Sequence, residues 1–169
     1  MLSTLPTWAI IKIRQQSNVI HCADTPDGQP VTIEQLDATF AARGFSREQR
    51  LIGHQQPRLQ HIGYHFVVGV NGIVTSGLAR RERGPAVVGQ KGAALQVCLV
   101  GSKQFTLAQW TSLRDLVGSL RHECLGLNVI GHNTLNSKTN CPGFDVAQWL
   151  NNSCSPRQKN ILEESNDAG

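Results

Sequence analysis

The sequence has no apolar run long enough to cross a membrane, since none approaches the ~20 consecutive apolar residues that a transmembrane helix needs. Residues 1–16 contain too short an apolar segment for a secretory signal, so we expect a soluble protein made in a cytoplasm. Charged residues are also scarce, at 17% of 169 residues, whereas 40% are hydrophobic. This composition excludes intrinsic disorder and is typical of one globular domain, because domains usually contain ~100 to 200 residues.

Cysteines are few and odd in number, which argues against the disulfide framework of a small secreted domain. The five cysteines are unevenly spaced: Cys22, Cys98, Cys124, Cys141 and Cys154. We therefore expect reduced thiols, with one or more of them bound to a metal. Acidic residues are outnumbered by basic ones, 12 to 16, and the net charge of +4 favours anionic partners but is too small to indicate nucleic acid.

Capping residues and hydrophobic spacing predict three helices. Thr32 and Thr106 each begin a Thr-x-x-Gln capping box. The first helix should span residues 32–43, and the second should present an amphipathic stripe to the core. The residues of that stripe are Leu107, Trp110, Leu113, Val117 and Leu120. A shorter helix is expected over residues 142–150, with Cys141 at its start, where the helix N-terminus would favour a thiolate.

Apolar runs bounded by turn residues predict the strands. We expect strands at residues 17–21, 63–70, 73–76, 94–100 and 127–130. The run at 94–100 is mostly apolar, which fits a central strand covered on both faces. The polar segment 131–140 is predicted to be a loop, and the longer segment 45–62 a surface loop of the kind that is often functional.

The Asn71-Gly72 step is the clearest turn signal, because it suits the positive φ angles of a type I′ hairpin. Regular alternation along the preceding strand would place Tyr64, Phe66 and Val68 on one face and His65 on the other. We therefore expect that Tyr64 and His65 do not serve the same site, and we interpret His65 as a structural residue.

Three potential metal ligands lie at the ends of predicted elements: His21, His132 and Cys141. More than a hundred residues separate His21 from His132, which a zinc finger would not show. A catalytic zinc is commonly held by three protein ligands from different elements, with the fourth position left to water. Spacing alone leaves open the alternative that these residues bind no metal. Histidine is often a core or surface residue whose hydrogen bonds are made within the protein, and cysteine is often a small buried apolar residue.

Ordered motifs strengthen the metal hypothesis: GYHFVV at residues 63–68, VCLVG at 97–101, and GHNTLNSKTNCPGFD at 131–145. In this order and spacing the chain resembles the zinc-dependent N-acetylmuramoyl-L-alanine amidases of the phage-lysozyme type, which are relatives of the peptidoglycan recognition proteins. The resemblance runs from about Val19 to Trp149. It implies a single α/β domain in which a central mixed sheet is flanked by helices and zinc lies in a groove on one side.

The resemblance also implies site residues. The zinc ligands would be His21, His132 and Cys141, and the catalytic residues Tyr64 and Lys138. Two neutral imidazoles and one thiolate leave a Zn²⁺ site with net positive charge, which would acidify a bound water and polarise an amide carbonyl. The phenol and the ammonium would stabilise the resulting oxyanion or move protons, each such donor being worth ~3 to 4 kcal/mol.

The chain also departs from the family pattern. Many members have Gly-x-His and a later Asn-Ser pair, where this chain has Ala86 and then Ala93-Ala94, so we expect altered contacts along the substrate groove. Some members have Glu in the central strand where this chain has Cys98. The general base would then be one of the two catalytic candidates or zinc-bound hydroxide. The loop between Lys138 and the cysteine ligand is also expected to be one residue longer than in the phage relatives.

These observations together predict a peptidoglycan hydrolase with a Zn²⁺ cofactor, an endolysin of a phage or prophage that cleaves the bond between N-acetylmuramic acid and L-alanine of the stem peptide. We expect a monomer that has no membrane span and no specific nucleic-acid partner, and that acts on the cell wall in the periplasm after release from the host cytoplasm. The catalytic domain should span residues 1–152, followed by a mobile tail at 153–169. The alternatives are a non-catalytic module on the same fold that binds peptidoglycan or a polymerase, and a structural zinc with four protein ligands.

Overall fold

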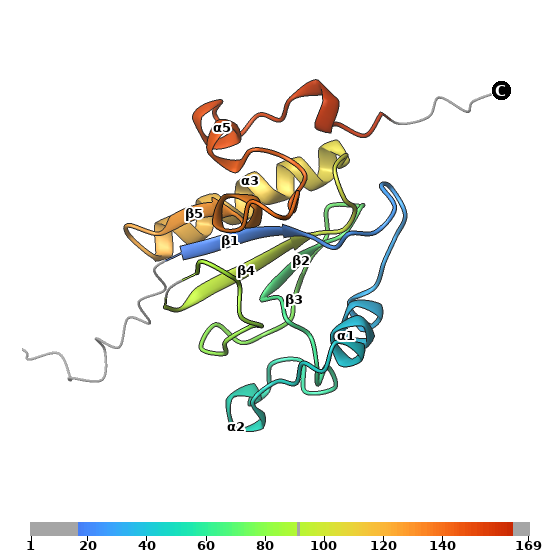
Figure 1. Ribbon diagram of the computed structural model, residues 1–169, viewed down its shortest axis with the longest axis vertical. Helices are drawn as coiled ribbons and strands as arrows, with labels where there is room; N and C mark the ends of the chain where they lie inside the picture. Colours follow the sequence, from blue (N-terminus) through green and yellow to red (C-terminus); the bar gives the residue numbers. More distant parts are fainter. Residues whose placement is uncertain (1–16, 91, 164–169) are drawn as a thin grey trace, which may run out of the picture.

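A mixed sheet of five strands forms the centre of the computed structural model, which describes residues 17–90 and 92–163 (Figure 1). The strands lie in the order β3-β2-β4-β1-β5, and every neighbouring pair is parallel except β2 and β3. They are β1 Ser17–Cys22, β2 Phe66–Val68, β3 Val74–Ser76, β4 Ala94–Leu99 and β5 Asn128–Gly131. Helices flank the sheet, so the predicted α/β architecture is confirmed.

The helices lie in two layers, with α1 on one side of the sheet and α3 and α5 on the other (Figure 1). They are α1 Ile33–Ala42, α2 Gln49–Ile52, α3 Leu107–Glu123, α4 His132–Leu135 and α5 Val146–Asn151. Both predicted capping boxes are present, at Thr32 and Thr106. None of the helices within residues 17–90 and 92–163 combines the length and apolarity needed to cross a membrane.

One member of the predicted stripe on α3 does not face the core. Leu107 is 64% exposed, at the first position of α3. Gln109 is fully buried instead, and its side-chain amide donates to the carbonyl oxygens of Val68 (3.3 Å) and Val100 (2.8 Å). The remaining four members of the stripe are buried, as predicted.

The central strands β1 and β4 are covered on both faces by apolar clusters. On the α3 side, Trp110 and Leu113 pack in the same cluster as Ile20. On the α1 side, Leu36 and Phe40 pack in a second cluster. Each such buried side chain contributes roughly 1.5–3 kcal/mol. Polar side chains on β1 and β4 are therefore in an apolar environment and need hydrogen-bond partners; the buried ones are Ser17, Asn18, His21 and Gln96.

The segment 45–62 is more ordered than the predicted surface loop. It contains the short helix α2, and it buries three apolar side chains: Ile52, Leu59 and Ile62. Arg47 forms an ion pair with Glu82 at 2.7 Å, and both side chains are almost completely inaccessible to solvent. Scattered apolar residues in a polar segment carry no periodicity, which is why the sequence did not indicate this packing.

The hairpin between β2 and β3 is present, but its turn is not type I′. Gly72 has a φ of +79°, whereas Asn71 does not lie in the left-handed region. The Gly72 N–H donates to the Gly69 carbonyl (2.8 Å), and the Gly69 N–H donates to the Ile73 carbonyl (3.0 Å). The reversal therefore uses a three-residue loop that ends in a left-handed glycine.

Two boundaries near the C-terminal end differ from prediction. The predicted loop 131–140 begins with the short helix α4. The predicted helix at 142–150 begins only at Val146, where the Asp145 side chain caps it by accepting from the Gln148 N–H (2.9 Å). Cys141 therefore lies in a loop and not at a helix start, and the argument that a helix N-terminus favours its thiolate was wrong.

Part of the predicted tail packs on the domain. Asn160 is 5% exposed, and its side-chain amide donates to the carbonyl oxygens of Lys103 (2.9 Å) and Gly143 (3.1 Å). Its own carbonyl accepts from the Trp110 indole at 3.1 Å. Because a polar residue makes these contacts, the lack of an apolar pattern after residue 150 did not predict that this segment packs on the domain. Residues 1–16 of the predicted catalytic domain and 164–169 of the predicted tail lie outside the described residues.

Candidate metal centre

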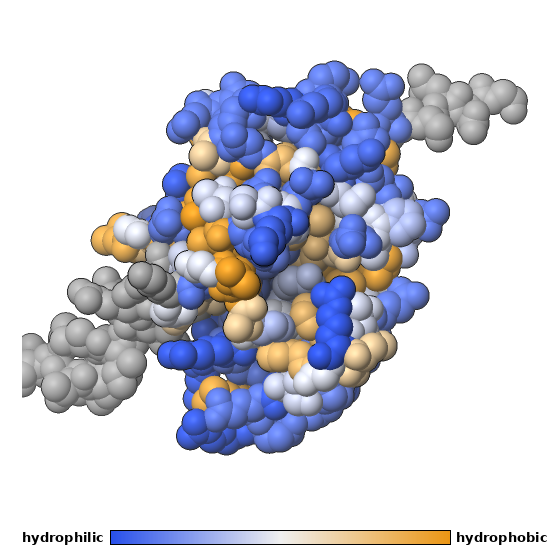
Figure 2. Space-filling view, in the orientation of Figure 1, coloured by the Kyte–Doolittle hydropathy of each residue, from blue (hydrophilic) through white to orange (hydrophobic). Residues whose placement is uncertain are grey.

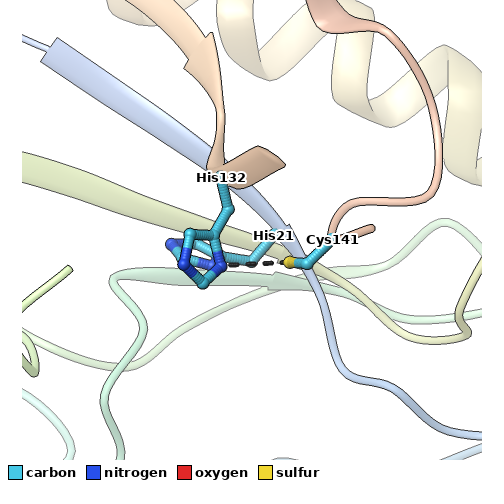
Figure 3. A group of neighbouring side chains, drawn as sticks. All are labelled: His21, His132 and Cys141. Carbon is cyan, nitrogen blue, oxygen red and sulfur yellow. Dashed lines mark hydrogen bonds between the residues drawn. The ribbon is translucent and has the colours of Figure 1, made fainter. Parts of the chain in front are cut away.

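Three segments deliver His21, His132 and Cys141 to one point at the edge of the sheet (Figure 3). His21 is near the end of β1, and His132 follows β5 directly as the first residue of α4. The two histidines become neighbours because β1 and β5 are parallel partners, with Ile20 opposite Gly131. Cys141 comes from the loop before α5. The ligand atoms of all three residues lie within 4.8 Å of one another.

The two rings and the sulfur point toward one another (Figure 3). The His21 Nδ1 atom is 3.7 Å from the Cys141 Sγ atom. The centroids of the His21 and His132 rings are 4.8 Å apart. The sulfur also accepts a hydrogen bond from the backbone N–H of Cys22, at 3.2 Å. Within the described residues, this is the one group of three or more His, Cys, Asp or Glu side chains arranged closely enough to hold a metal ion.

Burial sets the charge of these side chains. It lowers the pKa of His21 to about 4, although a hydrogen bond with Gln96 partly offsets the effect. Burial also lowers the pKa of His132. Both imidazoles are therefore neutral near pH 7 and have a lone pair free for a ligand. The hydrogen bond with the Cys22 thiol and burial together raise the pKa of Cys141, so a nearby cation is needed to hold its sulfur as a thiolate.

The donor chemistry fits zinc. Two imidazole nitrogens and one cysteine sulfur are borderline-soft ligands of the kind that catalytic zinc sites use. The three residues also line a pocket of about 280 Å³ and are not enclosed by a fourth ligand within the described part of the chain. An open position toward a pocket distinguishes a catalytic site from a closed structural one.

The pocket that contains the three residues also has an apolar wall. Phe40 from α1, with Pro85, Ala86 and Val87, lines its side. In the space-filling view, hydrophobic and weakly polar surface in the middle of this face lies beside strongly hydrophilic groups, and hydrophilic surface covers the regions of α2 and α5 (Figure 2). Ala86, where the resemblance predicted a change from the family pattern, is thus part of the pocket wall.

Tyr64 lines the same pocket, with its ring centroid 5.6 Å from that of His21. Its ring also packs edge-on against Phe40, at 5.0 Å. Burial raises the pKa of Tyr64 well above its usual range, and the neighbouring Cys98 thiol adds to this effect. The side chain is therefore a neutral phenol that can donate a hydrogen bond.

The predicted alternation was wrong at Tyr64. Tyr64 packs with the α1-side cluster, whereas Phe66 and Val68 belong to the cluster on the other face. The regular strand begins only at Phe66, and the carbonyls of Tyr64 and His65 accept from the successive N–H groups of Leu78 and Gly77. This irregular pairing breaks the period of two. His65 is nevertheless fully buried and does not line the pocket, as expected of a structural residue.

Lys138 is exposed and lies on the other side of Cys141. Its backbone N–H donates to the Asn136 side chain at 3.1 Å. The side chain lines a second hollow of about 640 Å³, which also includes Lys103. Cys141 and Thr139 line both this hollow and the pocket described above, so the two are neighbours on either side of the cysteine. The structure thus does not bring Lys138 into the pocket that contains Tyr64.

The structure shows the surroundings of two residues on β4, Gln96 and Cys98. Gln96 lines the pocket, and its Oε1 atom is 2.5 Å from the Nε2 atom of His21. The sequence offered one signal that could have revealed it, a long polar side chain inside an apolar run. Cys98 is fully buried beside His21, and burial raises the pKa of its thiol, so it does not replace the glutamate base of other members.

Comparison of the sequence with known proteins agrees with the family that the motifs indicated. Residues 14–144 match the family described as N-acetylmuramoyl-L-alanine amidase. The chain is 28% identical over 146 residues to the endolysin of Klebsiella phage KP32, which covers 80% of this chain and 87% of that protein. It is 28% identical over 138 residues to the endolysin of Escherichia phage T7, which covers 77% and 82%.

Solved structures share the fold. The endolysin and N-acetylmuramoyl-L-alanine amidase LysCS from Clostridium intestinale aligns with a TM-score of 0.66 at 20% identity, over 83% of each chain. A Drosophila peptidoglycan recognition protein, PGRP-SD, aligns with a TM-score of 0.53 at 18% identity, over 89% of this chain and 84% of that one. At these identities the likeness shows the arrangement of sheet and helices alone.

Proposed function

The chain belongs to the N-acetylmuramoyl-L-alanine amidase family, and from this premise we propose a zinc-assisted hydrolysis at the group formed by His21, His132 and Cys141. The activity is cleavage of the amide between N-acetylmuramic acid and L-alanine in peptidoglycan. The observation that carries the zinc proposal is the convergence of two neutral imidazoles and a sulfur, within 4.8 Å of one another, on the wall of an open pocket.

Each residue of the group has a role that its chemistry supports. A bound zinc ion would supply Lewis-acid polarisation of the amide carbonyl and would make a water more acidic. His21 and His132 present neutral nitrogens because burial keeps them unprotonated near pH 7. Cys141 would hold the ion as a thiolate, which would place one negative charge at the site.

Tyr64 and Lys138 are the proposed catalytic residues. The raised pKa of Tyr64 supports a role as a hydrogen-bond donor to the oxyanion of the tetrahedral intermediate and argues against a role as general base. Lys138 lies in the neighbouring hollow on the other side of Cys141. For a catalytic role its flexible side chain would have to reach past Cys141 into the pocket, where it would favour the developing negative charge or give a proton to the departing amine.

The relatives described above are phage endolysins, which supports a proposal about the cellular setting. We propose that this chain likewise acts on the cell wall of a bacterial host after release from the cytoplasm. We also propose that the catalytic unit extends to at least Glu163 and does not end at residue 152, because Asn160 is anchored to the domain.

The test combines metal analysis with product analysis. We expect the purified protein to contain one equivalent of zinc and to release stem peptides from purified sacculi. Cys141→Ser should lose both properties, because a hydroxyl is a poor replacement for a thiolate ligand. Cys124→Ser is the matched control, since Cys124 is also half-buried but lies at the end of α3, away from the site.

Two results would contradict the proposal. Full hydrolysis by protein stripped of metal would refute the zinc requirement. Tight binding to sacculi with no turnover at saturating zinc would indicate the non-catalytic binding module on the same fold.

A further inference from the structure

We propose that Gln96 is a positioning residue for the metal site: its side-chain oxygen fixes the proton of His21 on Nε2 and so leaves Nδ1 free as the ligand atom. This inference rests on the proposed zinc site. It concerns a residue that matches none of the family motifs described above. The observation behind it is the contact between the Gln96 Oε1 atom and the His21 Nε2 atom, at 2.5 Å.

The sheet places the two side chains on the same face. Strands β1 and β4 are parallel partners, with Val19 opposite Gln96 and His21 opposite Cys98. Side chains two positions apart on a strand point to the same face of the sheet. Gln96, opposite Val19, therefore lies on the same face as His21, two residues along the strand direction. Gln96 is 5% exposed and His21 6% exposed. The hydrogen bond is therefore shielded from competing water, which strengthens its control over the imidazole.

The chemistry of the two groups allows one arrangement. A carbonyl oxygen can only accept a hydrogen bond, so Nε2 of His21 must carry the proton and donate it. A neutral imidazole has one N–H, which leaves a lone pair on Nδ1. Nδ1 is the nitrogen that faces the Cys141 sulfur, at 3.7 Å. With the amide of Gln96 reversed, its NH₂ group would face Nε2, the proton would move to Nδ1, and the ligand lone pair would be lost.

The backbone of Gln96 is itself held in place. Its N–H donates to the Nδ1 atom of His65 at 3.0 Å, and its carbonyl accepts from the His65 N–H at 2.8 Å. The Nε2 atom of His65 donates in turn to the Glu82 carbonyl at 3.0 Å. These contacts fix the point from which the Gln96 side chain reaches His21. A polar partner for the second nitrogen of a metal-binding histidine commonly sets its tautomer and orientation.

The test uses three variants in the full chain and two measurements. Gln96→Met keeps the length and volume of the side chain but removes the acceptor. Gln96→Glu keeps an oxygen acceptor. Gln109→Met is the matched control, because Gln109 is a fully buried glutamine whose side chain bonds backbone groups alone, the carbonyls of Val68 and Val100 and the N–H of Thr106, on the other side of the sheet. Imidazole nitrogen NMR on metal-free protein reads the tautomer of His21, and competition with a chromophoric chelator reads the affinity for zinc.

We expect the unmodified chain to show His21 protonated on Nε2. Gln96→Met should lose that preference and bind zinc about 10- to 100-fold more weakly. Gln96→Glu should retain both properties, and Gln109→Met should lower thermal stability without changing the tautomer or the affinity. An unchanged tautomer and affinity in Gln96→Met, or an equal loss in Gln96→Glu, would overturn the inference.

Failure of the zinc proposal would look different. If the unmodified chain bound no zinc, the proposed function would lose its metal, whereas the tautomer of His21 in metal-free protein would still show whether Gln96 controls the ring. A reversed tautomer in the unmodified chain would overturn the positioning role directly.

Discussion

His21 uses both of its ring nitrogens, and each nitrogen faces a different kind of group. One contacts the amide oxygen of Gln96 and the other the sulfur of Cys141. Tyr64 stands across the pocket with its ring fixed against Phe40. At the scale of single residues, burial and hydrogen bonding therefore keep His21 and Tyr64 neutral near pH 7 in the metal-free site.

Removal of the Tyr64 hydroxyl tests its role as a donor. Tyr64→Phe should lower kcat about 10²- to 10³-fold, as loss of one oxyanion donor typically does. Zinc content and thermal stability should stay close to those of the original chain, because the ring that packs on Phe40 is kept. Turnover of muropeptide, with metal content measured on the same samples, checks this. Unchanged kcat in the variant would exclude Tyr64 from the chemical step.

At the scale of elements, one buried ion pair joins the segment 45–62 to the chain before β4. The Arg47 guanidinium donates to both carboxylate oxygens of Glu82, at 2.9 and 2.7 Å. It also donates to backbone carbonyls of its own segment: Gln55, Gln56 and Leu59. The Glu82 carbonyl accepts from His65, so this connection continues to β4 and to the backbone of Gln96.

Breaking this pair should therefore destabilise the domain strongly. Arg47→Met leaves the Glu82 carboxylate buried without a cation, and we expect the free energy of unfolding to fall by about 3–5 kcal/mol. Urea denaturation measures this. Arg50→Met is the control, because Arg50 and Glu48 form an ion pair on the exposed surface and such pairs contribute about 0–1 kcal/mol. Equal effects of the two substitutions would show that the buried pair has no special weight.

At the scale of the whole molecule, two buried histidines link stability to pH. Burial lowers the pKa of both His21 and His65 in the folded chain from 6.5 to about 4. In His65, Nδ1 accepts from a backbone N–H, so a proton added there would break that bond. The unfolded chain therefore takes up protons that the folded chain cannot hold.

The resulting prediction concerns metal-free protein. The contribution of each histidine is fully present above pH 6.5 and is lost as the pH falls from 6.5 toward 4, by about 3 kcal/mol per histidine. His65→Gln should keep a donor toward the Glu82 carbonyl and show a shallower decline over that range. Urea denaturation at several pH values is the measurement. A variant that declines as steeply as the original chain would contradict the assignment to His65.

The sequence by itself determined the elements whose signals are local. Both capping boxes join residues three positions apart, and the apolar run of β4 needs no distant partner to be recognised. The motifs that contain Tyr64, His132 and Cys141, and the predicted strand end at His21, likewise singled out the candidate residues, although Cys141 lies in a loop and not at the predicted helix start. These features depend on residues that are close together in the sequence, which is why the sequence alone predicts them.

Only the tertiary structure decided which distant groups meet. The order β3-β2-β4-β1-β5 brings His21 beside both His132 and Gln96. The irregular pairing before β2 turns Tyr64 to the α1 side, and a polar anchor docks Asn160 against the domain. Such contacts depend on strand order, register and breaks in regular geometry, which are set by the packing of the whole chain and leave no periodic trace in the sequence.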